Sequence, residues 1–197
     1  MAYNVFISFR YSDGHKLKDD LSNHFTSYAD TVDFSEDKDR SYLSELSIQN
    51  YLYGKLRRSS ITIVLLTPMA ITHKKNWARQ YDDWMYDEIR YSLEDRQNNR
   101  TNGLIAVYSS DAEDLLVERS NDGLTYVKDV DNLFRKNMMN IKTAYKHNPN
   151  YNQYDSDYDS YCSLIPYSRF TNNLGKYIDI AIEKRNNLYQ YNICKRL

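Results

Sequence analysis

Ser60-Ile61-Thr62-Ile63-Val64-Leu65-Leu66-Thr67-Pro68 is the stretch that decides the fold of this chain. From Ile61 to Leu66 it is almost continuously apolar and rich in β-branched side chains, a pattern typical of a strand that is buried on both faces. Pro68 has no backbone N–H to donate to a sheet, so we expect the strand to end before it. A strand of this kind indicates a parallel sheet that is covered by helices on both sides.

The rest of the chain alternates strand and helix patterns around this strand. Shorter apolar runs predict further strands at 5–9, 31–34, 103–108 and 161–165. Apolar residues recur every three or four positions between them, and they predict helices from a cap at Ser12 or Asp13 to about 28, at 41–58, at 77–95 and at 171–187. Because right-handed crossovers connect parallel strands, this order favours an open, doubly wound sheet.

The predicted fold class is therefore α/β: a flavodoxin-like, three-layer sandwich with a central, mainly parallel sheet flanked by helices. We expect one domain over residues 1–197, with a core at 2–110 and an elaborated C-terminal part at 111–197. Within that second part, the pattern predicts a helix at 130–145. The Asn-, Asp- and Tyr-rich segment 146–160 predicts a long surface loop.

Composition and charge exclude several classes of function. The chain has 26 Lys and Arg against 27 Asp and Glu residues, so its net charge of −1 gives no electrostatic reason to bind nucleic acid or an anionic membrane. Neither a membrane-spanning run nor a signal peptide is predicted. Cys162 and Cys194 lack a metal-ligand spacing and are interpreted as free thiols in a reducing cytoplasm.

Metal and cofactor motifs are also missing from the sequence. The four histidines have no mutual spacing that suggests zinc or a catalytic triad. With only 5 glycines in the chain, no glycine-rich phosphate loop can be assembled. We therefore predict no metal site and no bound cofactor.

The helix predicted at 77–95 carries the strongest candidate for chemistry. Trp84 and Glu88 are four residues apart, so the indole and the carboxylate project from the same helix face. A carboxylate beside an apolar ring loses water, which strengthens its attraction to a developing positive charge. The alternatives are that Glu88 is an ordinary solvated helix residue and that Trp84 is a core or interface anchor.

A second group of candidates follows from the predicted topology. In open α/β sheets the binding crevice lies beyond the carboxyl ends of the strands. Phe9, Arg10, Asp33, Phe34 and the loop after Leu66 should share the rim of this crevice. Ser8, Ser35 and Tyr42 are further contact candidates. Arg10 has the planar fork that suits phosphate oxygens, although an ordinary surface ion pair is the alternative. Phe9 could also be strand core, and Ser8 could satisfy backbone groups at the end of its strand.

Four of these motifs, taken in order, resemble a TIR domain. Val5 to Arg10 with Asp13-Gly14 is similar to its first strand and the following loop, and Val32-Asp33-Phe34 to its second strand. Ile61 to Pro68 is similar to the central strand, and Asp83 to Ile89 to the Trp-x-x-x-Glu helix that carries the catalytic glutamate of NAD-cleaving TIR proteins. The resemblance covers roughly residues 2–108 and is greatest to the TIR-like ThsB sensors of bacterial Thoeris anti-phage defence.

This resemblance implies a function and a set of roles. It implies an NAD glycohydrolase or ADP-ribosyl cyclase in which Glu88 is catalytic and NAD is the substrate, with activity conditional on activation. Ser8, Phe9, Arg10, Asp33, Ser35, Tyr42 and Trp84 would contact the substrate. It also implies a cytoplasmic protein that assembles through the loop Ser35–Arg40, responds to a phage-derived activator and reaches a downstream effector through a diffusible nucleotide, a cyclic ADP-ribose isomer.

Two other functions are compatible with the same sequence. A non-catalytic interaction module would use the TIR-like surface to assemble with partner TIR domains. A nucleoside-processing transferase of similar flavodoxin-like shape would accept a deoxynucleoside in place of NAD. Because a fold does not fix a function, the choice rests on the site residues and on the resemblance.

Overall fold

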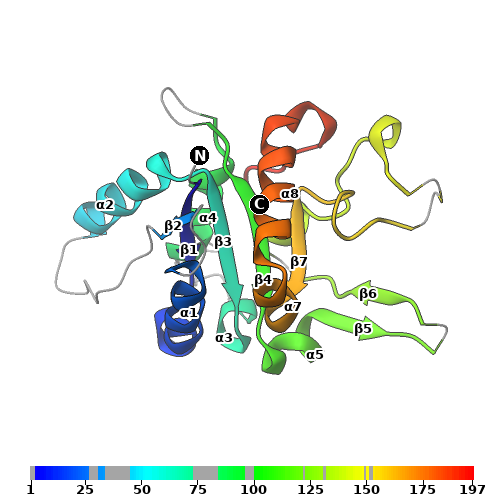
Figure 1. Ribbon diagram of the computed structural model, residues 1–197, viewed down its shortest axis with the longest axis horizontal. Helices are drawn as coiled ribbons and strands as arrows, with labels where there is room; N and C mark the ends of the chain where they lie inside the picture. The colour runs from blue at the N-terminus through cyan, green and yellow to red at the C-terminus, as the bar shows by residue number, and fades with distance from the viewer. Residues whose placement is uncertain are drawn as a thin grey trace.

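The computed structural model describes residues 3–26, 31–33, 45–72, 84–95, 100–121, 123–130, 132–148, 150 and 153–197. Within these residues the centre of the molecule is a five-stranded sheet in the order β2-β1-β3-β4-β7, and all neighbouring strands are parallel (Figure 1). The strands are β1 (Tyr3–Ser8), β2 (Thr31–Asp33), β3 (Ile61–Leu66), β4 (Gly103–Tyr108) and β7 (Cys162–Pro166). The α/β class and the parallel sheet predicted from the sequence are confirmed.

The strand at the centre of this sheet has the predicted burial on both faces. Every residue of β3 from Ile61 to Leu66 is buried, and Ile61, Ile63 and Leu65 contribute to a different core cluster from Val64 and Leu66. Successive side chains of a strand point to opposite faces, so β3 supplies apolar groups to both layers of helices. The hydrophobic effect on both sides thus holds β3 in the middle of the sheet.

Helices cover both faces of the sheet and complete the three layers (Figure 1). On one face the core cluster combines odd-numbered residues of β3 with α1 (Tyr11–Thr26), α7 (Tyr167–Asn172) and α8 (Leu174–Asn186). On the other face lie α2 (Glu45–Arg58), α4 (Trp84–Leu93) and α6 (Leu133–Lys136). We call these the α1/α8 face and the α2/α4 face. No helix among the described residues is long and apolar enough to cross a membrane.

The close packing of α8 on the sheet requires a glycine at the start of β4. A Cβ built on Gly103 would lie 2.7 Å from the backbone oxygen of Ala181, closer than real Cβ contacts come. Only a residue without a side chain therefore lets α8 approach β4 at this distance. Ile178 and Ala181 on the same helix are almost fully buried against the sheet, as the helical pattern predicts.

Several short elements were not predicted from the sequence. They are α3 (Pro68–Ile71), η1 (Ser110–Ala112), α5 (Glu113–Leu116), β5 (Val117–Arg119), β6 (Thr125–Val127), η2 (Thr143–Tyr145) and η3 (Leu188–Gln190). β5 and β6 pair antiparallel as a hairpin that projects from the body of the molecule (Figure 1), and Gly123 in its turn has a φ of +80°. With three residues each and mostly exposed side chains, these strands have too little periodicity to be recognised in the sequence.

The prediction of one helix over 130–145 is wrong. The described part of that range contains only one turn of α-helix, α6 (Leu133–Lys136), and the single turn η2. The apolar residues behind the prediction are nevertheless buried: Leu133 and Phe134 fully, Met138 and Ile141 by more than nine-tenths. Their spacing matches a helix by coincidence, because an irregular segment can also alternate between core and surface.

The segment predicted as a loop at 146–160 has neither helix nor strand where it is described, but it is closely organised. Asp159 is fully buried, and its carboxylate accepts hydrogen bonds from the backbone N–H groups of His147 (2.7 Å), Asn148 (3.3 Å) and Asp155 (2.8 Å). One buried carboxylate therefore accepts hydrogen bonds from three backbone N–H groups, so the carboxylate and all three donors are satisfied.

A buried lysine joins β7 to α8. Lys184 is 3% exposed, and its Nζ donates to Ser163 Oγ at 2.6 Å. Burial disfavours the charged ammonium group and lowers the pKa of Lys184 to about 8. The same environment raises the pKa of the neighbouring Cys162 thiol to about 12, again chiefly through burial. This part of the sheet therefore keeps both groups close to neutral at moderately alkaline pH.

The depressed pKa predicts how stability depends on pH. In the unfolded chain Lys184 keeps a proton up to a pH of about 10.5, whereas in the folded protein it loses the proton near pH 8. Rising pH in this interval favours the folded state, because unfolding takes up a proton there. Between pH 7 and pH 9.5 the wild type should gain about 2 kcal/mol of unfolding free energy relative to Lys184→Met, measured by chemical denaturation. A constant difference across this range would mean that Lys184 titrates normally.

Candidate functional site

Helix α4, which carries Glu88, is fixed to the sheet by buried polar side chains. Ser92 Oγ donates to the backbone oxygen of Glu88 (2.7 Å), which leaves the hydroxyl of Thr62 on β3 to donate to Ser92 Oγ (2.7 Å). The amide of Asn102 donates to Thr62 Oγ1 (3.2 Å), and its backbone N–H donates to the oxygen of Ser92 (2.8 Å). We call Thr62, Ser92 and Asn102 the polar knot. The polar knot fixes the position of α4 along the strands and its rotation about the helix axis.

Glu88 lies one helical turn from the polar knot, towards the carboxyl edge of the sheet. The end of α4 leads into the start of β4, so α4 runs opposite to the strands and Glu88 is nearer their carboxyl ends than Ser92 is. One turn corresponds to about 5–6 Å along the helix. Glu88 is only 7% exposed. The alternative, that Glu88 is an ordinary solvated helix residue, is therefore wrong.

Ser8 lies on the same face of the sheet and near the same edge. In the register of β1 and β3, Phe6 is opposite Thr62 and Ser8 is opposite Val64, and Val64 packs in the core cluster beneath α4. Ser8 is thus two residues, about 6–7 Å, beyond the level of the polar knot. Since Glu88 is displaced from the knot in the same direction, the structure brings Ser8 and Glu88 to one end of the α2/α4 face.

The hydroxyl of Ser8 is buried and makes no hydrogen bond to the part of the chain that the structure describes. Ser8 is 0% exposed, and its Oγ has no partner among the described residues. A buried hydroxyl without a partner costs about 1–3 kcal/mol, so such groups are rare in folded proteins. The interpretation that Ser8 satisfies backbone groups at the strand end is not supported. A ligand that bonds this hydroxyl would recover the cost.

Phe9 and Arg10 follow β1 at the carboxyl edge and are both half-buried. Phe9 packs with Leu17 against the core of the α1/α8 face, and a Cβ on Gly14 would lie 3.3 Å from the Phe9 Cβ. Its ring therefore turns to the opposite face from Glu88. Arg10 accepts a hydrogen bond from the N–H of Gly14 through its backbone oxygen (2.8 Å), which closes the first turn of α1.

The remaining predicted site residues are described only in part. Asp33 ends β2 beside Val5 of β1, so its backbone lies next to the strand that carries Ser8, and nothing is described of its side chain. Trp84 is the first residue of α4, again with the backbone alone described. Phe34, Ser35 and Tyr42, together with the loop Ser35–Arg40, lie outside the described residues.

Two further polar residues at the carboxyl edge were not singled out from the sequence as site candidates. Thr67, directly after β3, is 3% exposed and its hydroxyl has no partner among the described residues. Asp13 lies inside the first turn of α1, and its Oδ2 accepts the backbone N–H of Met69 at 2.9 Å. Asp13 therefore binds α3. The predicted cap at Ser12 or Asp13 is wrong, because α1 begins at Tyr11 and both residues lie inside it. The sequence signal for Thr67 is its place in the loop after Leu66, which the predicted topology puts on the rim of the crevice.

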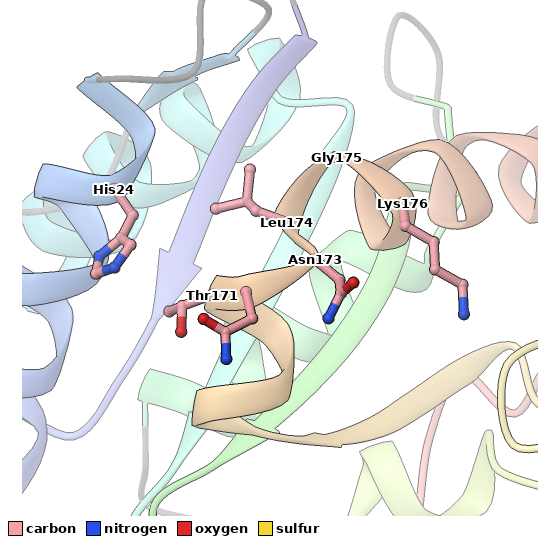
Figure 2. A pocket seen from close by; sticks show the side chains of 7 residues that line it. His24, Thr171, Asn173, Leu174, Gly175 and Lys176 are labelled. Atoms are coloured by element: carbon pink, nitrogen blue, oxygen red, sulfur yellow. The ribbon is translucent and has the colours of Figure 1, made fainter.

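A cavity lies elsewhere, on the α1/α8 face. It has a volume of about 420 Å³ and is lined by His24 at the end of α1 and by residues 171–176 at the junction of α7 and α8. Figure 2 shows His24 on one side of the opening and Thr171, Asn173 and Lys176 on the other. It belongs to the α1/α8 face, and none of the predicted site residues appears among its described lining. It therefore adds nothing to the site at Glu88.

The architecture is that of a three-layer α/β sandwich with polar groups at the carboxyl edge of its first and third strands. The family model described as the Thoeris protein ThsB, TIR-like domain, matches residues 6–114, more than half of the chain. The chain therefore belongs to this TIR-like family. The match includes Ser8 and Glu88 and ends before β5, so the hairpin, β7, α7 and α8 lie beyond it.

The other comparisons add little to this assignment. A search of solved structures finds the TIR domains of the activated Roq1 resistosome, whose title describes direct recognition of the pathogen effector XopQ. That match is 24% identical, covers 55% of this chain and 58% of the other, and has a TM-score of 0.36. No curated protein matches the sequence.

The two buried serines at this site give a paired prediction. Ser8→Ala should leave the free energy of unfolding unchanged or raise it by up to about 1 kcal/mol, because no hydrogen bond is lost. Ser92→Ala removes the donor to the backbone oxygen of Glu88 and the acceptor for the Thr62 hydroxyl. It should lower the free energy of unfolding by about 1–3 kcal/mol. Urea denaturation of both variants measures the difference. An equal loss in the two would show that the Ser8 hydroxyl is bonded inside the folded protein.

Proposed function

We propose that this chain is an NAD-cleaving enzyme that breaks the nicotinamide–ribose bond at Glu88 and releases a cyclic ADP-ribose isomer as a signal in anti-phage defence. Membership in the family supports a TIR-type role in defence signalling. The observation that carries the enzymatic part is the juxtaposition of Glu88 and Ser8. A buried carboxylate lies at the same end of the same face as a buried hydroxyl that has no partner among the described residues.

Glu88 suits the proposed chemistry because of its charge and its burial. Cleavage of the nicotinamide–ribose bond leaves an oxocarbenium-like ribose that carries positive charge. A carboxylate placed below the sugar stabilises this charge more strongly where water is excluded, since the local dielectric constant is low. Nicotinamide departs as a neutral molecule, so a strong general acid is not required. One carboxylate can then be sufficient.

The neighbouring residues have distinct proposed roles in substrate binding. The Ser8 hydroxyl would bond the ribose, which would satisfy a group that has no partner among the described residues. Arg10, at the carboxyl edge, would pair with the pyrophosphate. Trp84, at the start of α4, would form an aromatic wall that excludes water from the sugar. The predicted contact of Phe9 is withdrawn, because its ring packs on the other face of the sheet. Asp33, Ser35 and Tyr42 complete the proposed contacts from the second strand and its loop.

The product and the partners follow from the same proposal. With water excluded, an atom of the adenosine part of the same molecule attacks the ribose carbon, which closes a ring and gives a cyclic product. This diffusible nucleotide would activate a downstream effector, and a phage-derived component would trigger the reaction. The loop Ser35–Arg40 is the proposed surface for self-assembly. Since NAD is a cytoplasmic metabolite, we expect the protein to act in the cytoplasm.

Replacement of Glu88 is the direct test. Glu88→Gln and Glu88→Ala should each lower NAD cleavage by about 10²- to 10³-fold, the usual loss when one group that stabilises transition-state charge is removed. Products are resolved by chromatography after incubation of the purified protein with NAD, with and without extract from phage-infected cells. Asp95→Asn is the matched control, because it neutralises an exposed carboxylate just beyond the end of α4. The control should retain wild-type turnover.

Two outcomes would contradict the proposal. NAD cleavage that survives both Glu88 substitutions would remove this residue from its role. Phage protection that survives Glu88→Gln but is lost on changes in Ser35–Arg40 would favour the interaction module, in which assembly alone carries the signal.

A further inference from the structure

The segment Asn192–Leu197, which lies beyond the part that matches the family, runs across the α2/α4 face. We call it the strap. Before it, Tyr191 forms an antiparallel bridge with Ile141, and the N–H of Asn192 donates to the oxygen of Asn140 (2.9 Å). Ile193 and Cys194 then pack against the core cluster that includes Met85, Ile89 and Leu93 of α4. The strap thus shares its core with the helix that carries Glu88.

One buried amide anchors the middle of the strap. Asn137 is 0% exposed, its Nδ2 donates to the backbone oxygen of Cys194 (2.8 Å), and its Oδ1 accepts the backbone N–H of Cys194 (2.9 Å). The side chain therefore binds both backbone groups of one residue, as a neighbouring strand would. Asn137 Nδ2 also donates to the oxygen of Leu133 in α6 (3.0 Å). The anchor thus joins the strap to α6, which packs against α4 in the same core cluster.

Beyond this anchor the strap bonds to α4 itself. Arg196 NH2 lies 3.4 Å from Glu94 Oε1, directly after the end of α4. The backbone N–H of Leu197 donates to the hydroxyl of Tyr86 (3.5 Å), in the first turn of α4. Tyr86 and Glu94 are eight residues apart, so they lie on one side of the helix about two turns from each other. The end of the strap therefore contacts both ends of α4 through long side chains, and Glu88 lies between these contacts along the helix axis, on the side that faces the sheet.

Helix α2 also holds α4, next to the contacts of the strap, because Arg90 is four residues from both Tyr86 and Glu94. Arg90 NH2 donates to the hydroxyl of Tyr53 (2.9 Å), and the Tyr53 ring stacks on Tyr91 with centroids 3.9 Å apart. Arg90 NH1 also bonds Glu94 Oε1 at 2.9 Å, so the carboxylate that receives the strap is connected to the contact with α2. The helix is consequently held by both α2 and the strap on its outer side, and by the polar knot where it meets the sheet.

We propose that the strap positions α4, and with it the Glu88 carboxylate, for the reaction. The role of the strap in catalysis rests on the proposed function, whereas its hold on the helix does not. An exposed ion pair and one long hydrogen bond are each weak, but together with the buried anchor they fix both ends of a ten-residue helix. Displacement of a catalytic group by a fraction of an ångström is enough to slow a reaction.

Hydrogen exchange of the α4 amides tests the mechanical part. The double variant Tyr86→Phe/Arg196→Ala removes both contacts of the strap with α4 and leaves the Asn137 anchor in place. Its α4 amides should exchange about tenfold faster than those of the wild type, the effect expected from one ion pair and one hydrogen bond. Arg119→Ala is the matched control, an exposed arginine of the β5–β6 hairpin that pairs with Glu113. Equal α4 exchange in the double variant, the control and the wild type would overturn the proposal.

Turnover tests the functional part. The double variant should lower kcat for NAD cleavage by about tenfold and leave KM within about twofold, because the substrate contacts are intact and only the alignment of Glu88 changes. The single variant Arg196→Lys, which keeps the charge and leaves Tyr86 in place, should retain most of the wild-type kcat. If kcat is unchanged although α4 exchanges faster, the catalytic role of the strap is wrong. If the activated wild type does not cleave NAD, the proposed function fails, and the exchange measurement alone decides whether the strap holds α4.

Discussion

The hydrogen bonds among Thr62, Ser92 and Asn102 are the constraint on which the candidate site depends. They join the central strand β3, the start of β4 and helix α4 in a region where water is excluded, so each donor needs its acceptor. An apolar contact would hold α4 against the sheet without setting its rotation. The directional bonds set it, and thereby turn Glu88 inward, to the end of the sheet where Ser8 lies.

The parts of the molecule that repeat a simple pattern could be predicted from the sequence. The strand at Ile61–Leu66 is recognisable because both of its faces are buried, and helices such as α8 because apolar residues recur with the helical period. The four motifs shared with TIR domains gave the family and led to Glu88. The burial of Glu88 could not be read from the spacing to Trp84, because it depends on the polar knot, whose members are distant in sequence.

The elaborated second half was harder to predict because its order comes from individual polar side chains. Asp159 collects three backbone donors, and Asn137 imitates a strand for Cys194. Neither leaves a periodic signature, and an Asn- or Asp-rich segment without such bonds would have the same composition. The apolar residues Met138 and Ile141 imitated a helical period for a different reason, since they reach the core from an irregular chain. The Ser8 hydroxyl, which has no partner among the described residues, could not be recognised from the sequence, because its environment comes from strands and helices that are distant in the chain.

The position of β7 has a practical consequence for work on this family. The region that matches the family ends at residue 114, yet the partner of β4 on its outer side is β7 (Cys162–Pro166), and the helix that covers Ile105 and Val107 is α8. A fragment truncated at the family boundary would expose a row of free backbone donors and acceptors beside an uncovered apolar layer. Such an edge recruits other chains and promotes aggregation. Fragments intended for expression or crystallisation should therefore extend through α8.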